Sequence, residues 1–304
     1  RWALLTAAVA GYGLVMTPWF IRNFMVAGTP LAPGAARSVW LTTYEDLFRY
    51  PADAITPNAY LAQGIRGVAR GKLWVLGQNL QTLVAVQGMV FLGPFMVVGL
   101  WQLRAQRLAR MAVAYLGLLF FTMTFVFSFP GARGGLFHSG AALVPVLAVA
   151  AVYGVDHVVT WVAARRRSWE AQRARAVFRG GVVALAVGLT AMLIFVRVVQ
   201  GDRSHSDRLL ARVGAQLPAG SVVASNNPPG LYAAAGLAGV FIPTGTESTL
   251  GAVVAQYGVD YVLLDENHVP ALAPLYARQR RPDYLCPPLT PAPGVLLFPV
   301  APCD

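Results

Sequence analysis

The stretch WALLTAAVAGYGLVMTPWFIRN, Trp2 to Asn23, decides what kind of protein this is. The run from Trp2 to Ile21 carries no charge, and about 20 apolar residues are enough to cross a bilayer as a helix. The run closes with Trp19, Arg22 and Asn23. An aromatic ring followed by a cation is typical of a helix end at the boundary between lipid and water. The stretch therefore predicts a membrane span, and it raises the question of which side its polar end faces.

The remainder of the chain has the composition of a protein that crosses a membrane several times. Hydrophobic residues make up 56% of the sequence and charged residues 12%, whereas an ordinary soluble domain has roughly 45–50% and 25%. The missing charge leaves further long apolar runs. With the first run they predict a polytopic α-helical domain of five spans, the other four being Leu80 to Leu103, Met111 to Ala132, Leu136 to Ala164 and Gly180 to Val196.

Arginines indicate which connections lie in the cytoplasm. Arg104, Arg107 and Arg110 separate the second and third runs without any acid, and residues 165–179 carry six arginines against the single Glu170. Short loops rich in Lys and Arg stay on the cytoplasmic side. We therefore expect both connections there. The net charge of +11 reflects largely this pattern, so no nucleic-acid partner is predicted.

Alternation of the spans then gives the outer side. The long loop 23–79, the connection 131–140 and the tail beyond Arg197 are expected outside the cytoplasm, in a multi-pass protein of the plasma membrane. The polar end of the first span faces outward. The sequence begins at Arg1 without the charged region and cleavage motif of a signal peptide, and we expect it to be the C-terminal part of a longer protein.

The long outer loop contains two features. Glu45 and Asp46 form a compact polar cluster beside Tyr44. The cluster is either a polar site that contacts an acceptor or a metal ion, or a solvated loop, and we predict no metal. Farther on, apolar residues recur at helical spacing in residues 59–76, opposite Arg66 and Arg70. This pattern predicts an amphipathic helix on the membrane surface.

The tail, residues 201–304, changes to short strands separated by helical stretches and follows a membrane domain of residues 1–200. This alternation predicts a small extracytoplasmic α/β domain with a largely parallel sheet. The predicted strands are Ser221 to Ser225, Gly239 to Pro243, Asp260 to Asp265 and Val295 to Val300. The predicted helices are Ser206 to Gln216, Ser248 to Tyr257 and Val269 to Arg280. No nucleotide-binding fingerprint occurs in the tail, and we predict no cofactor.

Three features of the tail leave alternatives open. The turn NNPPG, residues 226–230, either shapes a binding crevice at the end of a strand or is a rigid turn. Asp265, which also ends a strand, is either catalytic or an ordinary acid before a helix. Cys286 and Cys303 either form a disulfide, as an oxidising compartment allows, or remain two thiols.

These features together carry a resemblance to a known family. Pro18, Trp19, Arg22 and Asn23 match a Pro-Trp-x-x-Arg-Asn signature, and residues 133–145 resemble a later basic segment before a proline-containing span. With its long outer loop, the chain resembles the C-terminal part of GT-C-type membrane glycosyltransferases. The nearest branch is bacterial and is similar to protein mannosyltransferases and lipid A aminoarabinose transferases. The tail, with NPPG and GVDYVLLD, resembles the outer domain often attached to such enzymes.

The resemblance implies transfer of a sugar from a polyprenyl-phosphate donor to a glycan, lipid or protein acceptor at the outer face, among membrane lipids. The family places its catalytic acid in the first outer loop, which is expected upstream of Arg1. The catalytic role is therefore not assigned to Glu45 or Asp46.

The leaving phosphate develops negative charge, and fixed cations beside it lower the barrier. Arg22, Arg133 and His138 are the candidates for binding the donor phosphate, and Asn23 for holding the turn beside it. The alternative is that both arginines contact only lipid headgroups and that His138 has no role.

Two other classes of function stay open. A transporter binds its substrate at mid-membrane, usually beside broken or charged helices, and the apolar runs show no charge there. A non-catalytic assembly or sensor protein would use the outer domain to bind a partner.

Overall fold

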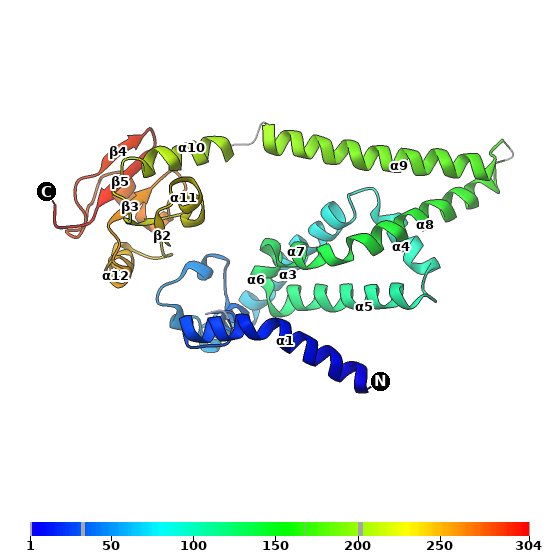
Figure 1. Cartoon of the computed structure of the whole chain (residues 1–304), viewed down its shortest axis with the longest axis horizontal. Helices are drawn as coiled ribbons and strands as arrows, with labels where there is room; N and C mark the ends of the chain where they lie inside the picture. The colour runs from blue at the N-terminus through cyan, green and yellow to red at the C-terminus, as the bar shows by residue number, and fades with distance from the viewer. Residues whose placement is uncertain (1, 32–33, 167, 200–202, 304) are drawn as a thin grey trace.

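The computed structural model describes residues 2–31, 34–166, 168–199 and 203–303. Figure 1 shows a layer of long helices and a C-terminal domain built around a sheet, which follows the last long helix. The predicted boundary between residues 200 and 201, Arg1 and Arg167 lie outside the described residues. The arrangement in Figure 1 contains both predicted parts, a helical membrane domain and a small domain of helices and strands.

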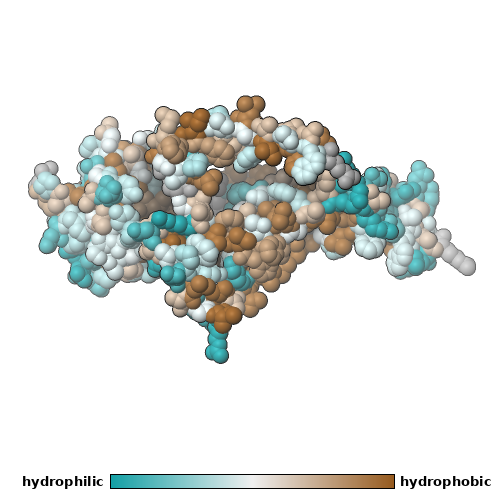
Figure 2. Space-filling model, turned by 90° about the horizontal axis from the view of Figure 1, so that it is seen from below, coloured by the Kyte–Doolittle hydropathy of each residue, from teal (hydrophilic) through white to brown (hydrophobic). Residues whose placement is uncertain are grey.

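Four helical stretches are long and apolar enough to cross a membrane. They are Trp2–Val26, Arg107–Val126, Ser128–Ala163 and Ala171–Val198, and they contain the helices α1 (Trp2–Ala27), α5 (Arg107–Phe121), α8 (Val144–Ala163) and α9 (Ala171–Ile194). Their apolar side chains are widely exposed, for example Leu14 at 79%. In Figure 2, hydrophobic side chains gather over the middle of the molecule and hydrophilic ones toward its ends. These helices identify a membrane protein.

The predicted second span is not one helix, and the count of five spans is not confirmed. Helix α3 (Gly64–Thr82) runs into a π-helical turn, η4 (Leu83–Gln87), and α4 (Gly93–Gln102) begins only after a break. Within the break, Met89 and Val90 adopt left-handed backbone angles, with φ of 44° and 60°, which side chains with a Cβ rarely adopt. An uncharged run predicts burial in lipid, but it carries no signal for this break.

Close backbone contact fixes α4 against α8. A Cβ added at Gly99 would lie 1.7 Å from the carbonyl oxygen of Ala150, and one added at Gly154 would lie 1.9 Å from that of Phe95. Small residues at such crossings let two helix backbones approach closely. Side chains from α4, α5 and α8, and from the residues just before α4 and α8, then form the apolar core of the membrane domain, which includes Leu92, Met96, Ala112, Leu143, Leu147 and Ala151.

A second irregular region lies between α5 and α8. The elements here are η5 (Thr122–Val126), α6 (Ser128–Pro130), η6 (Gly131–Gly135), α7 (Leu136–Gly140) and η7 (Ala141–Leu143). The backbone kinks at Arg133 and Gly134, and the φ of Gly134 is 126°, which suits a residue without a Cβ.

Polar side chains of α3 and η4 bond the backbone of this irregular region. Lys72 donates to the carbonyl of Phe125 at 2.7 Å, and Asn79 donates to that of Met123 at 3.2 Å. Gln87 donates to the carbonyl of Leu136 at 3.5 Å. Irregular backbone in a membrane protein needs such partners inside the protein, because lipid offers none.

The outer loop folds into short helices. They are η1 (Arg37–Trp40), η2 (Glu45–Phe48), η3 (Ala52–Ala54) and α2 (Pro57–Ala62). Thr56 caps α2 by accepting a hydrogen bond from the Ala59 amide at 3.1 Å. The amphipathic helix predicted over residues 59–76 is wrong in its bounds, because Gly64, with φ of 70°, separates α2 from α3.

The C-terminal domain has a five-stranded sheet in the order β2-β1-β3-β5-β4. The strands are β1 (Val222–Ser225), β2 (Ala238–Phe241), β3 (Tyr261–Leu264), β4 (Leu289–Ala292) and β5 (Val295–Pro299). β1 pairs in parallel with β2 and β3, whereas β5 pairs antiparallel with β3 and β4. The predicted largely parallel sheet is therefore wrong: the sheet is mixed, because β4 and β5 form a hairpin.

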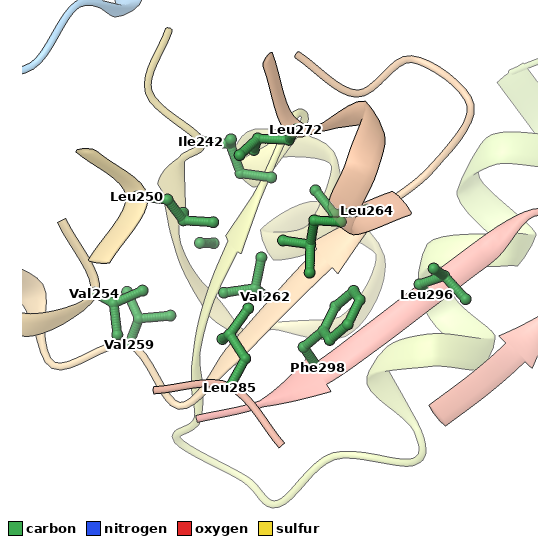
Figure 3. Close-up of a cluster of buried hydrophobic side chains, with 12 residues drawn as sticks. Ile242, Leu250, Val254, Val259, Val262, Leu264, Leu272, Leu285, Leu296 and Phe298 are labelled. Carbon is green, nitrogen blue, oxygen red and sulfur yellow. The ribbon is translucent and has the colours of Figure 1, made fainter. Parts of the chain in front are cut away.

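Helices cover both faces of this sheet. They are α10 (Arg203–Gly214), α11 (Pro228–Ala235), α12 (Glu247–Tyr257), η9 (Pro270–Leu272) and α13 (Ala273–Tyr276). The predicted helix from Val269 to Arg280 is shortened to η9 and α13. Figure 3 shows the larger core cluster, in which Leu250 and Leu272 pack against Val262, Leu264 and Phe298 of the sheet.

A disulfide joins Cys286 and Cys303, with 2.04 Å between the sulfur atoms. The first of the two alternatives for these cysteines is therefore confirmed. The bond ties Cys286, three positions before β4, to the end of the described chain.

Candidate functional site

A cavity lies in the outer loop, beside the end of α1. It has a volume of about 840 Å³ and is formed by three segments of the chain. Most of its lining is apolar, and two arginines contribute charge. The lining residues are Thr29, Pro30, Leu31, Gly34, Ala35, Ala36, Arg37, Ser38, Leu41, Leu47, Arg49, Ala52, Ile55 and Pro130.

The two arginines of the cavity differ in their partners. Arg49 lies 3.6 Å from the carboxylate of Asp46. Arg37 is exposed, and no acidic side chain among the described residues pairs with it. An apolar cavity with one unpaired guanidinium suits an amphipathic anion, because guanidinium binds phosphate or carboxylate oxygens through two parallel hydrogen bonds.

Asp46 holds the loop that forms one wall of the cavity. One oxygen of its carboxylate, Oδ2, accepts hydrogen bonds from the Thr42 amide at 2.8 Å, the Thr42 hydroxyl at 2.6 Å and the Thr43 amide at 3.0 Å. Burial raises the pKa of Asp46, but these hydrogen bonds and Arg49 outweigh it, so the pKa lies below its usual value. Asp46 is therefore a structural carboxylate, and Glu45 is the exposed acid of the predicted pair.

The predicted residues at the end of α1 have different surroundings. Asn23 is 4% exposed, and its Nδ2 donates to the carbonyl of Pro30 at 3.3 Å. Since Pro30 lines the cavity, this hydrogen bond connects α1 to the cavity wall, and the role of Asn23 in holding the turn stays a prediction. Arg22 is exposed, and its guanidinium carbon lies 5.3 Å from the centre of the Trp19 ring.

Arg133 and His138 lie together at the kink before α8. The guanidinium carbon of Arg133 is 4.8 Å from the ring centre of Tyr44 and 6.0 Å from that of Trp74. The His138 ring packs edge-on against Phe137 at 4.9 Å and borders the backbone of Gly134. Both predicted cations are exposed. In the described part of the chain, no hydrogen bond, ion pair or ring contact joins Arg22 to either of them.

The C-terminal domain contacts the loop at the rim of the cavity. The amide of Thr244 donates to the carbonyl of Phe48 at 2.8 Å, and its hydroxyl donates to that of Glu45 at 3.0 Å. The rings of Phe48 and Phe241 lie 5.2 Å apart. Since Leu47 lines the cavity, the tail supports one wall of the site.

The end of β1 in the tail is a helix start rather than an open crevice. Asn227 caps α11 by accepting from the Gly230 amide at 3.0 Å, and the first two positions of the helix are prolines. Prolines have no N–H, so few donors remain there for an anion. Asn226 donates to Asp265 at 3.4 Å and to the Asn267 carbonyl at 2.6 Å. The interpretation of NNPPG as a rigid structural segment is favoured.

Sequence analysis missed the cavity and its Arg37 and Arg49. Their charge was visible, but nothing in the pattern indicated that residues 29–55 fold back against Pro130. Within the described ranges, no group of three His, Cys, Asp or Glu side chains is placed to hold a metal ion. Comparison with protein-family models, curated proteins and solved structures finds no match.

Proposed function

We propose that this protein works as an integral-membrane glycosyltransferase that moves a sugar from a polyprenyl-phosphate donor to an acceptor at the outer face. The observation that carries this proposal is the loop cavity of about 840 Å³ beside the end of α1, apolar in most of its lining and charged at Arg37 and Arg49. A polyprenyl phosphate has the matching chemistry: a long apolar chain with an anion at one end.

The chemistry assigned to the cations follows from the leaving group. Breaking the bond between sugar and phosphate places negative charge on the phosphate oxygens, and fixed guanidinium groups stabilise that charge without reorganising. Arg37 has no acidic partner in the described residues, so its charge is available to the ligand. Arg133 follows Pro130 by less than one helical turn and takes the same role at the edge of the cavity, with His138 beside it. Arg22 interacts with the donor or with headgroups.

We also propose five membrane crossings, with the interrupted segment from α3 to α4 as the second. In Figure 1, α1 ends near the loop, whereas α5 begins at the opposite end of the helical layer. The chain returns between these points through α3 and α4. On this arrangement, residues 104–110 and 165–179 face the cytoplasm, and the loop and tail face outward.

The arrangement is tested by single cysteines labelled in intact cells with a membrane-impermeant reagent. Exposed positions suit this test, and Asn58, Gln106, Gln172 and Ala215 are exposed. Asn58→Cys and Ala215→Cys are expected to react, and Gln106→Cys and Gln172→Cys to stay unlabelled. Labelling of both Gln106→Cys and Gln172→Cys, with Ala215→Cys unlabelled, would show that the interrupted segment does not cross.

The proposed donor site is tested by binding of polyprenyl phosphate to the purified protein in nanodiscs. Arg37→Ala removes one charge-assisted contact of about 1.5–3 kcal/mol, which weakens binding roughly ten- to hundredfold. Ala36→Trp fills the cavity and is expected to act in the same direction. Arg66→Ala, an exposed arginine outside the cavity, is the matched control.

Sugar transfer to membrane acceptors is then measured for the same variants. Equal binding by Arg37→Ala, Ala36→Trp and the control would refute the donor site. Binding without transfer for every donor tried would favour the assembly or sensor function.

One observation favours transport as a second candidate. The break between α3 and α4 is a discontinuous helix of the kind that transporters use at their substrate sites. Beside it, the side-chain oxygens of Asn79 and Gln87 are buried without a hydrogen-bond partner. Substrate-dependent flux through proteoliposomes that is lost in Asn79→Leu, with donor binding unchanged, would support transport over transfer.

A further inference from the structure

Two apolar grooves flank the side chain of Trp101 near the end of α4. The groove between α4 and α5 has a volume of about 480 Å³, and the groove between α4 and α8 has about 530 Å³. Trp101 is 66% exposed and lines both. The grooves lie away from the loop cavity, at the end of the helical layer where α4 is connected to α5 (Figure 1).

Cations border the groove between α4 and α5. The guanidinium carbon of Arg104 lies 4.9 Å from the ring centre of Trp101, and its Nη1 donates to the Trp101 carbonyl at 2.8 Å. Arg110 lines the same groove from α5. No acidic residue lines either groove, so the groove combines apolar walls with uncompensated positive charge.

In the other basic connection, two arginines pair with acids of the chain itself. Between α8 and α9, Arg173 lies 3.8 Å from Glu170, and Arg179 forms an ion pair with Asp156. Across the described ranges, no acidic side chain pairs with Arg104, Arg107 or Arg110. Of the two connections, the one between α4 and α5 therefore has no arginine paired with an acid among the described residues, and its Arg104 and Arg110 also line an apolar groove.

We propose that the groove between α4 and α5 binds one anionic glycerophospholipid. Its phosphate contacts Arg104 and Arg110, and one acyl chain lies along the groove. The second chain passes on the other side of Trp101 into the groove between α4 and α8. Guanidinium groups bind phosphate oxygens directly, and basic pockets between membrane helices select anionic headgroups. The site is independent of the proposed transferase activity.

Native mass spectrometry of the purified protein tests this site, with phosphatidylglycerol and phosphatidylcholine of identical acyl chains as probes. Phosphatidylglycerol is expected to bind with a stoichiometry of one and phosphatidylcholine much more weakly. The double variant Arg104→Ala/Arg110→Ala is expected to weaken phosphatidylglycerol binding roughly ten- to hundredfold. Ala114→Trp, which fills the groove, is expected to weaken binding of both lipids.

The control is Arg173→Ala/Arg175→Ala, which removes the same charge from the other basic connection. Equal loss in this control would show that only overall charge matters and would overturn the proposal, as would unchanged binding in Ala114→Trp. Because Arg104 also bonds the backbone at the end of α4, Arg110→Ala alone provides a second measurement. Full binding by Arg110→Ala in a folded protein would overturn the assigned headgroup contact.

Discussion

The guanidinium of Arg133 lies over the ring of Tyr44, with 4.8 Å between the guanidinium carbon and the ring centre. This contact joins the kink before α8 to the outer loop. Tyr44 in turn packs edge-on against Phe48 at 5.9 Å, and Phe48 contacts Phe241 of the tail. A row of rings therefore connects the membrane helices to the C-terminal domain.

The first prediction concerns Tyr44. Tyr44→Leu removes the ring that faces the cation, a contact of about 0.5–1 kcal/mol at exposed sites. We expect amide hydrogen exchange in residues 41–49 to rise roughly two- to fivefold. Tyr44→Phe keeps the ring and serves as the control, so its exchange should match the native protein. Equal exchange in both variants would show that the contact adds nothing to the stability of the loop.

The second prediction separates Asp46 from Glu45. Asp46→Ala leaves the part-buried Thr42 and Thr43 amides without their acceptor, at a cost below the roughly 1–3 kcal/mol of a fully buried unsatisfied group. We expect a protease to cleave residues 40–56 much faster in Asp46→Ala than in the native protein. In Glu45→Ala, the same residues should be cleaved at the native rate. Faster cleavage in both would mean that the loop depends on its net charge rather than on these hydrogen bonds.

The lowered pKa of Asp46 also predicts that the loop becomes less stable in acid. Because the pKa of Asp46 in the folded state lies below its ordinary value of 3.8, the stabilisation is fully present above that value. It is lost as the pH falls through the folded pKa. Proteolysis of the loop should therefore accelerate below about pH 4, and Asp46→Asn should lack this acid-dependent part.

The third prediction concerns the contact between α4 and α8. Gly99→Leu places a side chain where the backbone of Ala150 lies, and overpacking of this kind costs typically about 1–3 kcal/mol or more. We expect a lower thermal midpoint in detergent and less monodisperse protein. Gly117→Leu, at a position in α5 with no atom near its added Cβ, is the control. A similar loss in both variants would assign the effect to the glycine substitution itself.

The fourth prediction concerns alkaline unfolding of the tail. Burial, with Glu247 nearby, raises the pKa of Tyr284 to about 12, and its hydroxyl donates to the Glu247 carbonyl at 2.6 Å. The neutral phenol is therefore favoured in the folded state. Its contribution is fully present below the unfolded pKa of about 10 and disappears as the pH rises toward 12. Circular dichroism should show the sheet destabilised in this interval, and Tyr284→Phe should show a smaller change over the same interval.

Much of the membrane domain follows from local composition. Long apolar runs overlap α1, α5, α8 and α9, and they predict helices because about 20 apolar residues are enough to cross a bilayer. The break after α3 does not follow in this way. Its residues, Met89 and Val90, are ordinary apolar residues, and their left-handed backbone depends on packing among distant segments.

In the tail, some local sequence patterns are compatible with more than one structure. Asn227 followed by two prolines predicts a turn, but a cap and prolines at the first positions also start a helix, as in α11. Strand β4 is short and contains Pro291, which lowers its β propensity. Local sequence patterns do not predict the loop cavity, because it depends on contact between the loop and Pro130, which is distant in the sequence.

The bridge between Thr244 and the outer loop has a consequence for biosynthesis. The hydroxyl of Thr244 and the carbonyl of Glu45 that it contacts are separated by 199 positions in the chain. Chains emerge from the ribosome N-terminus first, at roughly 5–20 residues per second. Glu45 is therefore synthesised well before Thr244, and the hydrogen bond between them can form only after the intervening residues have been made. Until the tail has formed its sheet, Phe48 lacks its contact with Phe241. Maturation of the loop is therefore a late, post-insertion event, and a chain that stalls before residue 244 presents that ring to chaperones and proteases.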